Sequence, residues 1–212
     1  MKLQTKILIG ALGLTLVLGG AFGVNSYYEK RQYEAHAAQL AFSWPSIDFY
    51  FFYQIFMSWV NGGVSGPNNN VLSATLINKL KPYYNYDLSV ARYAYTTRFN
   101  NLAMTDCTKI YFGNRTIVDD LRSNRTLTLS EVSWLSHELT HGEQCIRWGG
   151  RANYANTWFK QVAKAALAAI LSGNFSGLAQ EISGAQSSAV HDKMSMEQEA
   201  NQRAATVVSH WR

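Results

Sequence analysis

Apolar and polar positions divide the chain into distinct stretches, and the first of these is almost continuously apolar. Residues 7–24 contain no charged side chain, and Lys2 and Lys6 precede them. A basic start followed by an apolar run is typical of an export signal, but a run of this length also suffices to span a bilayer as a helix. We therefore expect residues 1–24 to be a signal peptide or a membrane anchor, with a buried N-terminal helix as the alternative.

The next stretch, residues 25–70, combines a polar linker with an aromatic-rich segment. Residues 25–39 are polar and charged, whereas residues 42–60 are crowded with Phe, Tyr and Trp. The spacing does not separate helix from strand, and we interpret this segment as a core element. An exposed patch that contacts a membrane or a partner is the alternative. Gly, Pro and Asn residues at 62–70 then predict a loop and a boundary near residue 70.

Periodicity in the remaining segment, residues 71–212, predicts helices around a few short strands. Apolar spacing predicts helices over residues 72–80, 130–148, 161–171 and 194–208, while residues 88–95 and 109–112 are typical of strands. Ser130 is the expected N-cap of the second of these helices, and Gly149 and Gly150 are expected to end it. The expected fold class is α+β, mostly helical.

Composition supports one folded domain and excludes one class of partner. The chain has 212 residues, of which 47% are hydrophobic and 16% are charged, so it can bury a sizeable core. The formal net charge of +5 includes two lysines of the presumed targeting segment. No Lys/Arg cluster is interleaved with aromatic residues, so we expect no binding to nucleic acid.

The candidate chemistry is carried by a pair of histidines that lie four residues apart. The pentapeptide His137-Glu138-Leu139-Thr140-His141 falls within the predicted helix over residues 130–148. A four-residue step returns to nearly the same face of a helix, so both imidazoles can bind one metal ion, for which Zn²⁺ is the natural choice. Glu138 would then act as a general base on a metal-activated water. A surface helix with two solvated histidines is the alternative.

A catalytic zinc site needs a third protein ligand, and the last predicted helix offers Glu197. Asn201 lies four residues further on, so it would face the same site and accept a hydrogen bond from a ligand imidazole. Glu199 would point about 160° away from Glu197 on a straight helix and is the weaker candidate. A solvated charge is the alternative for Glu197. Tyr154 could donate a hydrogen bond to an oxyanion, although packing is the commoner role of a tyrosine.

Two cysteines, Cys107 and Cys145, agree with an exported protein, because an oxidising compartment allows a disulfide to form and persist. Two buried thiols are the alternative. Cys145 lies four residues past His141 and is also a candidate soft metal ligand, but a disulfide is the preferred interpretation.

At these residues the sequence resembles a bacterial zincin-like family, described as a domain of unknown function, whose members read HELTH in the active helix and are similar to gluzincin metallopeptidases. The similar segments cover residues 71–208: LINKLKPYYNYDLSVARYAYTT at Leu76–Thr97, CTKIYFG at Cys107–Gly113, GEQCIRWGG after the second histidine, Tyr154, and EQEA at Glu197–Ala200. The resemblance implies a zincin-like fold over residues 71–212, with the active helix packed on a small sheet. It also implies two histidine ligands, Glu138 as the base and Glu197 as the third ligand.

Two departures from the pattern bear on activity. Asn201 stands where many gluzincins have Asp, so the partner of the ligand imidazole is neutral and increases ligand basicity less. Gly142-Glu143 replaces an apolar pair after the second histidine, which leaves the helix packing there open.

The sequence thus predicts an extracytoplasmic zinc metallopeptidase that acts on a peptide or protein substrate and contacts the membrane if the N-terminal segment is retained. A catalytically weak or inactive binding module of the cell envelope is the alternative.

Overall fold

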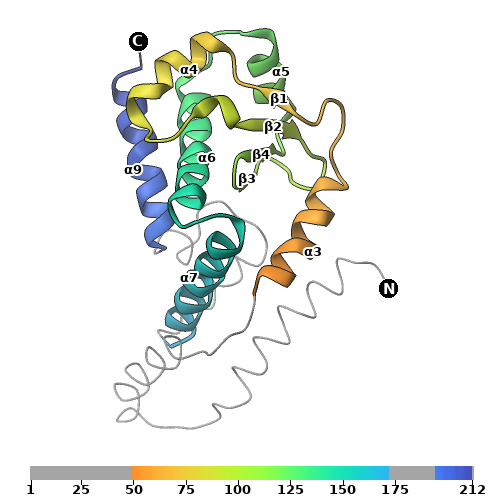
Figure 1. Cartoon of the computed structure of the whole chain (residues 1–212), viewed down its shortest axis with the longest axis vertical. Coiled ribbons are helices and arrows are strands. Elements are labelled where there is room, and N and C mark those ends of the chain that lie inside the picture. Colours follow the sequence, from red (N-terminus) through yellow and green to blue (C-terminus); the bar gives the residue numbers. More distant parts are fainter. Residues whose placement is uncertain (1–48, 172–193, 212) are drawn as a thin grey trace. The chain divides into compact units, whose positions relative to one another are not determined.

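The computed structural model describes residues 49–171 and 194–211, in which helices surround a four-stranded mixed sheet (Figure 1). The predicted fold class, α+β and mostly helical, is confirmed. In chain order the elements are α3 (Phe49–Asn61), β1 (Asn70–Val71), α4 (Ala74–Leu80), the 3₁₀ helices η1 (Lys81–Tyr83) and η2 (Leu88–Val90), β2 (Arg92–Tyr95), β3 (Ala103–Asp106), β4 (Lys109–Phe112), α5 (Arg115–Ser123), α6 (Leu129–Arg147), α7 (Arg151–Leu171) and α9 (Ser195–Ser209).

The apolar segment over residues 1–24 and the linker over residues 25–39 lie outside the described residues. None of the helices in the described ranges is both long enough and apolar enough to cross a membrane.

The sheet has the order β1-β2-β4-β3, with β2 parallel to β4 and β3 antiparallel to β4. Alternation along the strands sends successive side chains to opposite faces. Tyr93 and Ile110 accordingly join an apolar cluster with α4, α5, α6 and α9, whereas Ala94 and Tyr111 join a second cluster with α3 and α7. The sheet is thus covered on both faces, and β3 forms the edge strand that contacts α6.

Helix α6 begins at a capping box that the sequence analysis misplaced. Thr128, and not Ser130, is the N-cap: its backbone is extended and its Oγ1 accepts a hydrogen bond from the Glu131 amide. The Glu131 carboxylate in turn accepts one from the Thr128 amide at 2.8 Å. This reciprocal pairing satisfies two amides that would otherwise lack a partner at the helix start, which is why the helix begins there.

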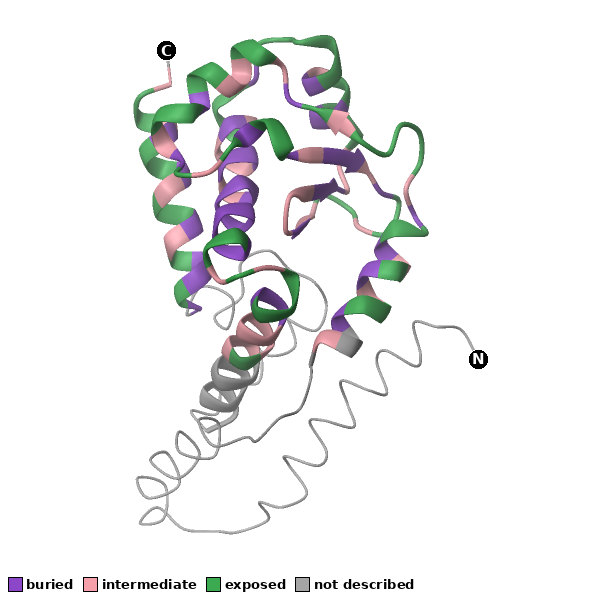
Figure 2. Ribbon diagram, viewed as in Figure 1, coloured by how far each residue is buried: buried purple, intermediate pink, exposed green. Residues whose placement is uncertain are grey.

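Helix α6 then runs between α9 on one side and β3 and β4 on the other (Figure 1). Nearly every residue from Leu135 to Cys145 is buried (Figure 2). The predicted end of the helix is confirmed, because Gly149 and Gly150 have φ values of 85° and 107°, a conformation that glycine adopts at little cost.

Several other boundaries differ from those that the sequence predicts. Helix α7 begins at residue 151 instead of 161, and residues 88–90 of the expected strand form η2. Strand β3 and helix α5 were not predicted. β3 is a four-residue edge strand with little apolar alternation, so its pairing with β4 depends on the rest of the fold. Helix α5, in contrast, carries a readable signal: an Asn114 cap before the buried Ile117, Val118 and Leu121.

The aromatic-rich segment is a core element over the residues that the structure describes. Helix α3 buries Tyr53, Met57 and Val60, which lie four and three residues apart and so share one face. Residues 42–48 of this segment lie outside the described ranges.

Candidate metal centre

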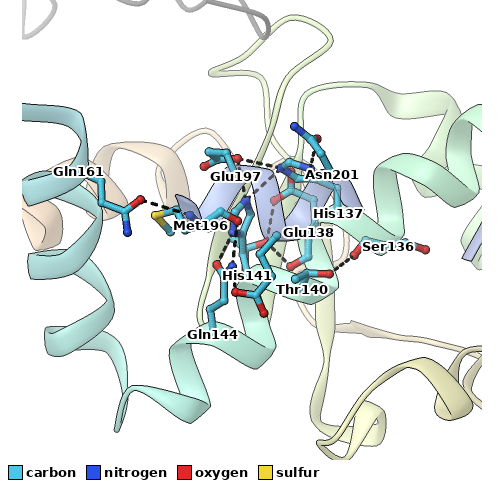
Figure 3. A network of polar contacts seen from close by, with 12 residues as sticks. Ser136, His137, Glu138, Thr140, His141, Gln144, Gln161, Met196, Glu197 and Asn201 are labelled. Carbon is cyan, nitrogen blue, oxygen red and sulfur yellow. Dashed lines mark hydrogen bonds and ion pairs between the residues drawn. The ribbon is translucent and has the colours of Figure 1, made fainter. Parts of the chain in front are cut away.

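The three predicted ligands meet at one point between α6 and α9 (Figure 3). Glu197 Oε2 lies 3.1 Å from His137 Nε2 and 3.2 Å from His141 Nε2. The two Nε2 atoms are 3.0 Å apart. Among the described residues, these three side chains form a group of metal-ligating type, with donor atoms close enough to bind one ion.

The spacing of these donors suits a small tetrahedral cation. Ligands about 2.0–2.1 Å from a tetrahedral Zn²⁺ lie about 3.3 Å from one another. The observed separations of 3.0–3.2 Å between the donors of His137, His141 and Glu197 are close to that value. Two imidazoles and one carboxylate are also the donor set of many catalytic zinc sites, so the residues present fit such an ion.

Two amide side chains orient the imidazoles. His137 Nδ1 lies 2.9 Å from Asn201 Oδ1, and His141 Nδ1 lies 2.9 Å from Gln144 Oε1. A carbonyl oxygen only accepts, so each Nδ1 carries the proton and each Nε2 directs its lone pair at the ion position. The contact predicted between Asn201 and a ligand imidazole is present, and it falls on His137.

Gln144 is a site residue that the sequence analysis missed. Its side chain is fully buried, and its amide nitrogen donates to the Met196 carbonyl at 2.9 Å and to Glu199 at 3.0 Å. These two contacts turn its oxygen toward His141. The sequence feature that could have identified Gln144 is its position three residues after His141, because side chains with this spacing on a helix are neighbours.

Glu199 points away from the ligands, as the helical geometry predicts. It forms a two-pronged ion pair with Arg147, with distances of 2.7 and 2.8 Å. Its pKa is lowered, first because Arg147 donates hydrogen bonds to the carboxylate. Glu199 therefore links α9 to α6 and supports Gln144 instead of binding a metal.

The electrostatics of the site favour a positive charge among the three donors. Burial by itself lowers the pKa of His141, but the charge of Glu197 and a hydrogen bond to it, with smaller contributions from Glu138 and Gln144, raise that pKa to about 9. Three lone-pair atoms at this separation repel one another unless a cation or a proton lies between them. The protein thus brings together groups whose arrangement a bound cation stabilises.

Glu138, the predicted base, lies on the side of α6 that faces the edge strand. Its side chain is buried, and its Oε2 accepts a hydrogen bond of 2.7 Å from Thr105 Oγ1 on β3. The same hydroxyl lies 3.1 Å from the Glu138 carbonyl oxygen. Thr105 could not be identified from the sequence, because nothing in the spacing connects residues 33 positions apart.

Tyr154 lies beside the site, near the start of α7. Its buried ring packs edge-on against His141, with centroids 6.4 Å apart, and stacks with Trp148 at 6.0 Å. Burial raises its pKa well above the usual value, so the hydroxyl keeps its proton and remains a donor. It makes no hydrogen bond within the described part of the chain.

The two residues after His141 adapt α6 to its surroundings. A Cβ at Gly142 would lie 3.1 Å from the hydroxyl of Tyr86, so glycine permits that close approach. Glu143 is buried and accepts a hydrogen bond of 2.7 Å from the Asn85 amide, and it pairs with Arg203 of α9 at 3.1 Å. Polar pairing therefore replaces the apolar contacts expected at this point of the helix.

A disulfide joins Cys107, in the turn between β3 and β4, to Cys145 on α6. The predicted pairing is confirmed, and it removes Cys145 from the candidate metal ligands. The cross-link lies one helical turn from His141 and fits an oxidising, extracytoplasmic location.

Comparison of the chain with protein-family models, curated proteins and solved structures finds no match.

Proposed function

We propose that this protein is a zincin-like, zinc-dependent metallopeptidase of the gluzincin type that hydrolyses a peptide or protein substrate. The observation that carries the proposal is the convergence of His137, His141 and Glu197 at tetrahedral spacing, with the carboxylate of Glu138 one residue from the first ligand. Both features are what hydrolysis at a metal site requires.

Each residue has a separate role in this proposal. When bound by His137, His141 and Glu197, zinc would polarise the scissile carbonyl and acidify a water molecule. Glu138 would take the proton from that water and later donate it to the leaving amine. Tyr154, which keeps its own proton, would donate a hydrogen bond to the negative charge that develops on the carbonyl oxygen.

We place this activity outside the cytoplasm. The disulfide between Cys107 and Cys145 supports an oxidising compartment, and the basic, then apolar, residues 1–24 support export. If that segment is retained, the protein would be anchored to the membrane with the domain over residues 71–212 on the outer side.

A second candidate is a metal-stabilised binding module of the cell envelope without turnover. The observation in its favour is burial: Glu138, His141 and Glu197 are all buried, so a substrate would have little room to reach the ion position. The neutral Asn201 beside His137 also favours this second candidate, because a carboxylate at that position would increase the basicity of the imidazole more.

Metal analysis of the purified protein, together with cleavage of a fluorogenic peptide library, tests the proposal. We expect about one zinc per wild-type chain and loss of that zinc in His137→Ala. The matched control is His210→Ala, which removes an exposed histidine at the end of α9 and should keep the metal. A metal content unchanged by His137→Ala would overturn the ligand assignment.

Glu138→Gln separates the two candidates. The variant keeps the size of the side chain and should bind zinc like the wild type, but cleavage should fall by about 100-fold or more, because an amide cannot accept the proton. Equal cleavage by both proteins would refute the role of Glu138. Zinc binding without cleavage by the wild type would favour the binding module.

A further inference from the structure

The buried hydroxyl of Thr105 connects the edge strand β3 to the carboxylate of Glu138. Thr105 Oγ1 lies 2.7 Å from Glu138 Oε2 and 3.1 Å from the carbonyl oxygen of the same residue. A threonine hydroxyl has a single proton to donate, and it forms the stronger hydrogen bond with the nearer acceptor, Glu138 Oε2. Thr105 thus donates to the side chain of the proposed base.

This contact leaves the two oxygens of Glu138 in different surroundings. Oε2 is occupied by Thr105, whereas Oε1 makes no hydrogen bond with any residue in the described ranges. A carboxylate that rotates freely would exchange its two oxygens. With Oε2 held, Oε1 is the atom left to accept a proton.

Strand β3 is itself held firmly at this point. Asp106, the next residue, accepts a hydrogen bond of 3.1 Å from Tyr53 of α3 and pairs with Arg151 at the start of α7 at 2.6 Å. The disulfide of Cys107 then ties the following turn to α6, the helix that carries Glu138. The backbone of Thr105 is therefore fixed relative to both sides of the site.

The side chain of Thr105 adds its own rigidity. A β-branched residue has few χ1 rotamers in a strand, so a fixed backbone also fixes the direction of the hydroxyl. Valine has nearly the same shape and lacks only the donor. Serine keeps the donor and loses the methyl group.

We propose that Thr105 is the positioning residue of Glu138: it holds Oε2 so that Oε1 takes the proton of the attacking water. The inference rests on the proposed peptidase function. In the proton transfer, the proton passes from water to Glu138 Oε1 and the remaining hydroxide bonds to the scissile carbonyl carbon, while the Thr105 proton stays on Oγ1.

The test compares Thr105→Val, Thr105→Ser and Thr96→Val in the full-length protein. Thr96 is a matched control, because it is equally buried beside the same sheet and its hydroxyl donates to a backbone carbonyl, that of Val60, at 3.0 Å. We expect Thr105→Val to lower kcat by about 10- to 100-fold at unchanged KM and zinc content, because a displaced base loses alignment with the water. Thr105→Ser should restore most of kcat, and Thr96→Val should leave it near that of the wild type.

A second measurement on metal-free protein tests the contact without any turnover. The shift in melting temperature caused by Thr105→Val should be smaller in a Glu138→Ala background than in the wild type, since the partner is already absent. Additive shifts would overturn the proposal, as would a kcat of Thr105→Val equal to that of Thr96→Val. If the wild type binds zinc but cleaves no peptide, the proposed function fails, and the melting shifts still decide whether Thr105 holds Glu138.

Discussion

The hydrogen bonds from His137 to Asn201 and from His141 to Gln144 should increase the affinity of the candidate site for zinc, and the size of each contribution can be predicted. Loss of such a partner usually weakens metal binding by about 10- to 100-fold, that is, by about 1.4–2.7 kcal/mol. The two partners differ in exposure: the side chain of His137 is 16% exposed and its partner Asn201 lies at the surface, whereas the side chain of His141 is 6% exposed and Gln144 is fully buried. Water can therefore replace Asn201 more easily than Gln144.

We expect Asn201→Ala to weaken zinc binding by about tenfold and Gln144→Ala by about 100-fold, the lower and upper ends of that range. Asn201→Asp should bind zinc more tightly than the wild type, because a carboxylate increases the basicity of His137 more than an amide does.

The assay is competition for zinc with a chromophoric chelator at fixed pH and ionic strength. Gln202→Ala is the control, since this neighbour on α9 is exposed and its side chain makes no contact with the ligands within the described residues. The reasoning would be refuted if Asn201→Ala and Gln202→Ala bound zinc equally, or if Asn201→Asp bound it more weakly than the wild type.

Three further predictions concern the stability of the fold. Thr128→Ala removes the N-cap of α6 and should lower the free energy of unfolding by about 1 kcal/mol in urea titrations, and an unchanged midpoint would contradict the capping box. Reduction of the Cys107–Cys145 disulfide frees a segment with a sequence separation of 38, so the chain-entropy model predicts a loss of about 4 kcal/mol. The melting temperature with and without a reducing agent measures this loss, and equal values would count against it. Burial raises the pKa of Asp106 above 3.8, although Arg151 lowers it in part. The native state therefore binds the carboxyl proton of Asp106 more tightly than the unfolded chain does. Wild-type stability relative to Asp106→Asn should therefore fall as the pH rises above about 3.8, and a difference that stays constant from about pH 3 to about pH 7 would contradict the shift.

Local patterns were enough to predict the central helix and the candidate metal ligands. The four-residue step between His137 and His141 places both imidazoles on one face of any α-helix, whatever surrounds it. The same periodicity places Glu197 and Asn201 on one face of α9 and Glu199 on another, and the contacts of all three side chains agree with this arrangement. The glycines at 149 and 150 end α6 for an equally local reason, their positive φ.

Errors arose where two local signals competed. Both Thr128 and Ser130 are acceptable caps, and only the reciprocal bond from Glu131 selects the first. A four-residue edge strand such as β3 carries too little alternation to be recognised, because its stability comes from pairing with β4 and from its contact with α6.

The sequence by itself determined which side chains can bind a metal, which carboxylate lies between the two candidate histidine ligands along the chain, and on which helical face each one lies. Only the tertiary structure decided what surrounds them, because contacts between α6, α9 and β3 join residues tens of positions apart. Thr105 reaches Glu138 across 33 positions, and Gln144 reaches Met196 across 52. Helical and strand periodicity act over a few residues, whereas such distant contacts depend on the packing of the whole core.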